Sequence, residues 1–227
     1  MNRLIKTETM KKAIKKLVVL GISAVATTSI FAQEQKATGE IKLTPKIGIK
    51  GGVNLSNLYV DNVKDENVKV GANIGFYAKI PVVKGLSIQP EVLYSQKGAQ
   101  VNYNNILGSG KYRYNFDYIE VPITAVINVA KNFNILAGGY TGFLASAKVK
   151  DVDANGNIRG VTELNKDNFE SFDYGLVGGL GFDIENTNIG LRYSYGLKNI
   201  GKDGSLSGNL LQNSKNSVIS LTIGFAF

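Results

Sequence analysis

Four charged residues are the first candidates for chemistry in this sequence: Lys50, Glu91, Glu120 and Arg192. Each lies on the polar side of a segment in which apolar and polar residues alternate, and the segments place all four at comparable height. Two neighbouring carboxylates are the acid and base pair of many glycosidases. Here, however, the two cations would keep both carboxylates ionised. The pattern therefore predicts a mutually neutralising set of interior ion pairs, with a gated conduction path or a proton relay as the alternative.

A second candidate site is a calcium-like segment. Asp151, Asp153 and Asn155 place oxygen ligands at alternate positions and Gly156 follows at the sixth position, as in the opening of an EF-hand loop. The twelfth position is Thr162, where that loop requires glutamate. Asn-Gly is also a favoured pair for a tight hairpin turn. We therefore expect a hairpin tip, with weak surface calcium binding at the three oxygen-bearing residues as the alternative.

The composition excludes several classes of function. The chain contains no cysteine and no histidine, and so lacks thiolate ligands, disulfides and the commonest general base. Its net charge is +8, but residues 1–32 hold six of the 26 basic residues and one of the 18 acidic ones, which leaves +3 for the remainder. This small charge does not support nucleic-acid binding. We expect a non-enzymatic protein without a cofactor and without a nucleic-acid partner.

Residues 1–32 have the features of an export signal. Four lysines between positions 11 and 16 precede an apolar run over 17–31, and Ala32 offers a small residue at a plausible cleavage site. We expect a signal peptide over 1–32, with an uncleaved membrane anchor as the alternative, and a short periplasmic segment over 33–45. The remaining domain covers 46–227.

From residue 46 onward the hydrophobic period is two, which predicts β-strands with two unlike faces. The links after the second, fourth and sixth strands are tight turns, and the other links are polar loops near 58–67, 100–111, 150–168 and 200–215. This alternation is typical of an all-β, eight-stranded antiparallel up-and-down barrel in an outer membrane, with short periplasmic turns and longer extracellular loops. The expected strands are 46–57, 68–81, 86–99, 112–129, 133–149, 169–185, 188–199 and 216–227.

The apolar face of these strands carries no charged residue in their central parts, as contact with lipid requires. A soluble barrel that binds apolar ligands would show the reverse arrangement. Aromatic residues of this face form one row near the turns and one near the loops: Phe76, Phe133, Phe182, Phe225 and Phe227; Tyr94, Phe143, Tyr174 and Tyr195. The aromatic residues between 112 and 118 have the opposite parity to the apolar residues below them. We expect a β-bulge near 117–119, or a strand end that projects above the membrane.

Several runs of residues resemble a known family. The runs QPEVLYSQKG (89–98), YIEVP (118–122), GIKGGVN (48–54) and GFAF (224–227) are similar to the PorT-like outer-membrane β-barrel family of Bacteroidetes-type bacteria. The resemblance implies location in the outer membrane, contact with its lipid, and recognition of Phe227 by the barrel assembly machinery. It also implies, as one alternative, an accessory role in protein secretion or envelope assembly.

The expected function is a structural or surface-interaction role, with the four polar loops contacting an extracellular or periplasmic protein partner. A narrow pore for small solutes is the other alternative.

Overall fold

The computed structural model describes residues 44–59, 68–105, 108–153, 155–202 and 213–227. The elements are β1 (Lys46–Tyr59), β2 (Lys69–Val83), β3 (Leu86–Asn105), β4 (Gly108–Asn128), β5 (Phe133–Asp153), β6 (Ile158–Glu163), the 3-10 helix η1 (Lys166–Asn168), β7 (Phe172–Ile184), β8 (Thr187–Gly196) and β9 (Lys215–Ala226). The described part of the chain contains no helix with the length and hydropathy needed to cross a membrane. The expected signal peptide and residues 33–43 of the expected periplasmic segment lie outside the described residues.

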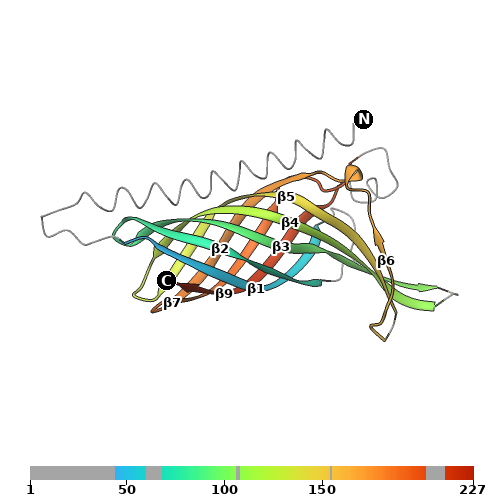
Figure 1. Ribbon diagram of the computed structural model, residues 1–227, viewed down its shortest axis with the longest axis horizontal. Helices are drawn as coiled ribbons and strands as arrows, with labels where there is room; N and C mark the ends of the chain where they lie inside the picture. The colour runs from blue at the N-terminus through green and yellow to red at the C-terminus, as the bar shows by residue number, and fades with distance from the viewer. Residues whose placement is uncertain (1–43, 60–67, 106–107, 154, 203–212) are drawn as a thin grey trace, which may run out of the picture. The chain divides into compact units, whose positions relative to one another are not determined.

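Eight strands form a closed antiparallel ring in the order β1, β2, β3, β4, β5, β7, β8 and β9 (Figure 1). The ring closes because β9 pairs with β1, from Gly48 opposite Ala226 to Tyr59 opposite Lys215. Closure gives every strand of the ring two neighbours, so the ring has no edge that would expose backbone groups to hydrocarbon. The eight-stranded barrel that the period-two pattern predicts is confirmed.

The short and long connections alternate as expected. Tight links occupy residues 84–85, 129–132 and 185–186, all at the end of the barrel where the C-terminus lies (Figure 1). Gly85 and Glu185 adopt positive φ angles of 87° and 52° in two of these turns. The tight turns therefore mark the periplasmic end, and the longer connections mark the extracellular end.

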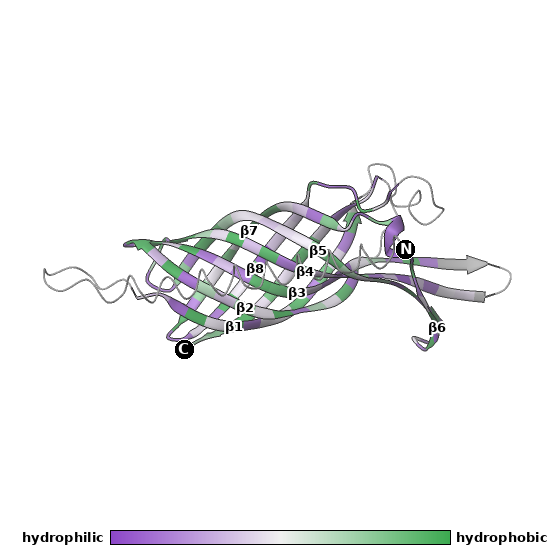
Figure 2. Cartoon of the chain, turned by 45° about the horizontal axis from the view of Figure 1, so that its top comes forward, coloured by the Kyte–Doolittle hydropathy of each residue, from purple (hydrophilic) through white to green (hydrophobic). Residues whose placement is uncertain are grey.

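Two of the four expected loops contain more strand than the sequence indicated. The region 100–111 continues β3 and β4 into a long hairpin, and Val101 still pairs with Tyr112. The region 150–168 contains the end of β5, the added strand β6 and η1. Both hairpins project beyond the ring (Figure 2). Backbone pairing therefore continues past the membrane-spanning part. Residues 60–67 and 203–212, the centres of the other two expected loops, lie outside the described residues.

The two faces of the wall are sorted as the sequence predicted. On β9, Leu221 is 58% exposed whereas Thr222 is 4% exposed, and on β8 Leu191 is 49% exposed whereas Arg192 is 6% exposed. The bands of opposite hydropathy along the strands are visible in Figure 2. Apolar side chains therefore face outward toward lipid, and polar side chains fill the interior.

Two explanations were expected for the aromatic residues near 112–118, a β-bulge near 117–119 or a strand end that projects above the membrane. Phe116 and Tyr118 are fully buried and share the inward direction of Glu120, so β4 needs no bulge to turn them toward lipid. A register shift does lie between Asp117 and Tyr118, but the extra residue, Ala145, belongs to β5, because Asp117 pairs with Ser146 and Tyr118 pairs with Leu144. The upper part of β4 continues into the projecting hairpin, as the second explanation expects. Phe116 and Tyr118 point inward because they cover the lumen.

Candidate functional site

The lower part of the lumen holds an ion-pair network centred on Glu91 of β3. Arg192 of β8 donates through Nη1 to Glu91 Oε2 (2.9 Å) and through Nη2 to Oε1 (2.6 Å). Lys50 of β1 donates to Oε1 over 3.0 Å, and Gln89 donates to the same oxygen over 2.7 Å. The Glu91 carboxylate and the Lys50 ammonium are almost completely buried. This lower network has two cations and one carboxylate, and therefore a net charge of +1.

A second network lies farther toward the loops and is centred on Lys97 of β3. The Lys97 ammonium forms an ion pair with Glu120 of β4 and lies 3.5 Å from Asp173 Oδ2 of β7. It also lies 4.2 Å from the ring centroid of Tyr140. Asp173 Oδ2 accepts hydrogen bonds from the Tyr140 hydroxyl (3.0 Å) and from Asn216 Nδ2 (2.9 Å). This upper network has one cation and two carboxylates, and therefore a net charge of −1.

Three members of the lower network and one member of the upper network were expected from the sequence. The structure brings Lys50, Glu91 and Arg192 together, but it pairs Glu120 with Lys97 rather than with these residues. Lys97 and Asp173 were missed, although both lie on the inward side of their strands and are nearly fully buried. Both have odd numbers, as the other inward residues of β3 and β7 have, and this shared parity could have identified them. The two networks neutralise one another in sum, as burial of charge in a barrel requires.

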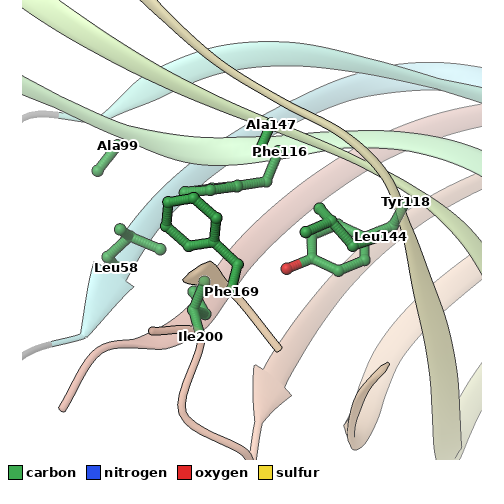
Figure 3. Packing of buried hydrophobic residues seen from close by; sticks show 8 residues of the cluster. All are labelled: Leu58, Ala99, Phe116, Tyr118, Leu144, Ala147, Phe169 and Ile200. Carbon is green, nitrogen blue, oxygen red and sulfur yellow. The ribbon is translucent and has the colours of Figure 1, made fainter. Parts of the chain in front are cut away.

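An apolar cluster covers the lumen at the loop end. Phe116, Tyr118, Leu144 and Ala147 come from the inner wall of β4 and β5, and they meet Phe169 and Ile200 from the loop segments (Figure 3). The rings of Phe116 and Phe169 pack edge to face, with 5.2 Å between their centroids. Leu58 and Ala99 complete the cluster. We call this group of eight residues the apolar cap.

The loop segments of the apolar cap are held by backbone bonds. Phe169 bridges to Gly201, and the amide of Glu170 donates to the carbonyl of Ile200 over 2.8 Å. The sequence placed Phe169 inside a strand, but β7 begins at Phe172. Phe169 instead lies in a connection that folds back over the barrel.

The sequence comparison agrees with this architecture. Residues 31–201 match the model of a family described as outer membrane protein β-barrel domain. The chain belongs to this family. It is thereby an outer-membrane protein, as the outward apolar face of the barrel requires.

Solved structures of other small barrels are similar to this family member. Ail, the attachment invasion locus protein of Yersinia pestis, is 16% identical over 82% of this chain and 100% of its own, with a TM-score of 0.45. Neisserial surface protein A is 11% identical over 80% and 97%, with a TM-score of 0.44. OprG of Pseudomonas aeruginosa is 15% identical over 82% and 97%, with a TM-score of 0.36. The search of the curated proteins gives no match.

The calcium-like segment of this outer-membrane barrel is the β5–β6 hairpin. Asp153 accepts hydrogen bonds from the backbone N–H of Asn157 (2.8 Å) and from its side-chain amide (3.2 Å). These bonds to the ionised form lower the pKa of Asp153 below its ordinary value, the backbone N–H of Asn157 being the largest cause. Gly156 has a φ of 90° at the tip. Asp153 thus organises the turn, and the described residues contain no cluster of three or more acidic, histidine or cysteine side chains suited to a metal.

Phe227 lies at the end of β9 on the outer surface. Its backbone N–H donates to the carbonyl of Ile47 over 2.9 Å, and 80% of the residue is exposed. Its ring is therefore free of packing against the rest of the barrel, in the position of the turn-side aromatic row.

Proposed function

We propose that this outer-membrane barrel is a non-conducting, non-enzymatic scaffold that presents its loop-side hairpins for interaction at the cell surface. The observation that carries the proposal is the filling of the lumen at three successive levels: the lower network, the upper network and the apolar cap. A barrel whose lumen is filled in this way is a rigid support for its connections. Connections on a rigid support are where recognition usually resides.

The state of the carboxylates supports a role without catalysis. Glu91 is held by two cations and Glu120 by a third, and the two carboxylates belong to separate networks. Catalysis by a carboxylate pair requires one member that can carry a proton at neutral pH. Glu91 and Glu120 do not form such a pair, because each is bound by the cations of its own network.

Two measurements test the scaffold proposal together. Planar-bilayer recordings of the folded protein should show no conductance above leak. Cross-linkers placed on the projecting hairpins at Val101 and Val161, both about half exposed, should capture a surface partner on intact cells. The same cross-linker at Val82, an exposed position at the turn end, is the matched control. Steady single-channel steps, or capture from Val82 alone, would contradict the proposal.

A narrow pore is the second candidate, and one feature of the lumen favours it. Buried polar atoms such as Asn73 Oδ1 and Asp173 Oδ1 have no hydrogen-bond partner in the protein. Buried polar groups of this kind are ordinarily hydrated. A chain of hydrated groups could pass protons or small ions if the apolar cap opened. Conductance of the wild-type protein that is lost when the cap is cross-linked would favour this candidate.

We also propose the finer assignments that the motifs suggest: membership of the PorT-like branch in a Bacteroidetes-type bacterium, export through a cleaved signal peptide at 1–32, and recognition of Phe227 by the assembly machinery. The exposure of the Phe227 ring supports the last of these. N-terminal sequencing of the membrane form tests cleavage. Comparison of Phe227→Ala with Phe225→Ala in cells tests whether the final aromatic residue has a special effect on assembly.

A further inference from the structure

The extra residue on β5 changes which side chains face outward above the membrane. Below Ala145 the inward residues of β5 are even-numbered, as with Tyr140 and Leu144, both buried. Just above Ala145 the inward residue is Ala147, so the direction of the strand has switched at this level, although Val152 farther out, on the side of the lysines, is again buried. Without the switch, Lys148 and Lys150 would point toward the apolar cap. The bulge instead turns both lysines to the outer face, which is a known use of β-bulges.

On the outer face the two lysines join cations of β4. Residues directly opposite one another in antiparallel strands share a face. Arg113 lies opposite Lys150, and Asn115 lies opposite Lys148. Lys111 lies one alternate position farther along β4 on the same side. We call Lys111, Arg113, Lys148 and Lys150 the basic face of the hairpin sheet.

The cations of the basic face are incompletely neutralised. Lys148 pairs with Glu163 over 3.3 Å, but its side chain remains 38% exposed. Arg113 donates through Nε to Gln100 Oε1, a neutral group, over 3.0 Å. Within the described residues, neither Lys111, Arg113 nor Lys150 forms an ion pair with a carboxylate. Asp117 and Glu163 are the carboxylates of this face, so four cations meet two acids.

The basic face continues the lipid-facing wall without a break. Tyr94, Ile119 and Phe143 lie side by side in one row of the outer surface, where the loop-side aromatic residues mark the membrane boundary. Asn115 lies four residues beyond Ile119 on β4, and Lys148 of β5 lies opposite Asn115. At about 3.3 Å per residue and a tilt of about 40°, this is about 10 Å above the boundary. Lysine and arginine side chains can extend back toward the headgroups over that range.

We propose that the basic face binds the phosphate groups of outer-leaflet glycolipid headgroups. The occupant follows from charge complementarity and from position: the cations rise from the lipid boundary through the zone in which phosphorylated sugars of a glycolipid lie. Guanidinium and ammonium groups are the usual ligands of phosphate. The bulge at Ala145 is then a positioning feature, because it brings two of the four cations to the membrane side of the sheet.

Native mass spectrometry in an uncharged maltoside detergent tests this proposal, with diphosphoryl lipid A and its dephosphorylated form as probes. The wild-type barrel should retain the diphosphoryl lipid and not the dephosphorylated one. The triple variant Arg113→Gln, Lys148→Gln, Lys150→Gln should bind it at least about tenfold more weakly, because each cation near an anionic surface contributes roughly fivefold. The charge-preserving variant Lys148→Arg, Lys150→Arg should bind as the wild type does.

A matched control removes the same kind of charge from the other end. Lys84→Gln, Lys131→Gln alters two exposed lysines at the tight turns and should leave lipid binding unchanged. Each variant is first checked for the heat-dependent gel mobility of a folded barrel. The proposal is overturned if the triple variant binds like the wild type, if the control loses as much affinity, if the dephosphorylated lipid binds equally, or if inorganic phosphate at millimolar concentration displaces the lipid. Preferential capture of an acidic protein on cells by the same face would also overturn it.

Discussion

Arg192 and Glu91 form a two-point ion pair across the full width of the barrel. The residues are 101 positions apart, and their strands, β8 and β3, are four places apart in a ring of eight. The pair therefore joins opposite walls, and Lys50 adds a bond from a third strand. A contact of this kind resists both flattening of the ring and slippage of the strands.

Loss of Arg192 should be costly because Glu91 would then have Lys50 as its remaining cation partner. The substitution breaks two charge-assisted hydrogen bonds to the buried carboxylate, each worth about 1.5–3 kcal/mol, so the expected cost is about 3–5 kcal/mol. We expect Arg192→Met to lower the free energy of unfolding by that amount, measured by urea denaturation of the detergent-folded barrel. The control is Lys79→Met, which removes a partly exposed pair with Asp183 at 2.7 Å and should cost about 1 kcal/mol or less. Equal losses in the two variants would show that the cross-barrel pair has no special role.

The upper network should respond asymmetrically to substitution. Lys97→Met leaves Glu120 and Asp173 buried with no cation between them, whereas Asp173→Asn leaves the Lys97 and Glu120 pair intact. We expect Lys97→Met to be the more destabilising by about 2 kcal/mol or more, and the neutral triple variant with Glu120→Gln and Asp173→Asn to recover part of the loss. Urea denaturation of the four proteins checks the order. A triple variant less stable than Lys97→Met would contradict this charge argument.

A charged side chain on the outward face should destabilise the barrel more when it lies deeper in the membrane. Leu221 is exposed in the middle of β9, and an arginine there would face hydrocarbon. We expect Leu221→Arg to cost about 2–4 kcal/mol in lipid vesicles. Val161→Arg, at an equally exposed site on the projecting strand β6, should change the stability by about 0.5 kcal/mol or less. The comparison fails if both arginines have the same effect, because the wall around Leu221 would then not be in contact with lipid.

The strands and their two faces could be predicted because the pattern that identifies a strand lies within that strand. Alternation of side chains is a local property, and Leu221 or Arg192 can be assigned to a face from its immediate neighbours. The partner of Glu120 could not be predicted in this way. Contacts across a lumen depend on the tilt and stagger of strands that are distant in sequence, and these appear when the ring closes. Lys97 and Asp173 were therefore missed although their parity was correct.

The apolar cap shows a second limit of the sequence pattern. The parity of Phe116 and Tyr118 suggested a β-bulge or a strand end above the membrane. They point inward because Phe169 and Ile200, from loops with no periodic pattern, fold over them. No local signal distinguishes an aromatic residue that borders lipid from one that covers a lumen. The bulge at Ala145 likewise depends on tertiary packing.

The β5–β6 hairpin should open at acidic pH. The pKa of Asp153 is lowered in the folded hairpin by the bond from the Asn157 N–H, so its contribution is present above the ordinary carboxyl pKa of about 4 and is lost as the pH falls through the lowered value. The protection factor of the Asn157 amide, its exchange rate relative to that of an unfolded peptide at the same pH, should show loss of protection in that range while the amides of β9 stay protected. Asp153→Ala should show the fast exchange already at neutral pH, and Asp151→Asn, which removes an equal charge from the strand, should not. Unchanged exchange in Asp153→Ala would rule out the turn role of this carboxylate.

The apolar cap should limit passage through the loop end of the barrel. Phe116 and Phe169 form its central ring pair, and Phe169 comes from a connection that backbone bonds hold over the lumen. Phe116→Ala with Phe169→Ala removes both rings, and we expect it to lower stability by about 3 kcal/mol or more. Conductance should nevertheless stay at leak, because the two ion-pair networks still fill the lumen below. Adding Arg192→Ala and Lys97→Ala should produce measurable conductance, provided that the gel mobility shows a folded barrel. Conductance in the double aromatic variant alone would show that the cap is the sole barrier and would favour the gated pore over the scaffold.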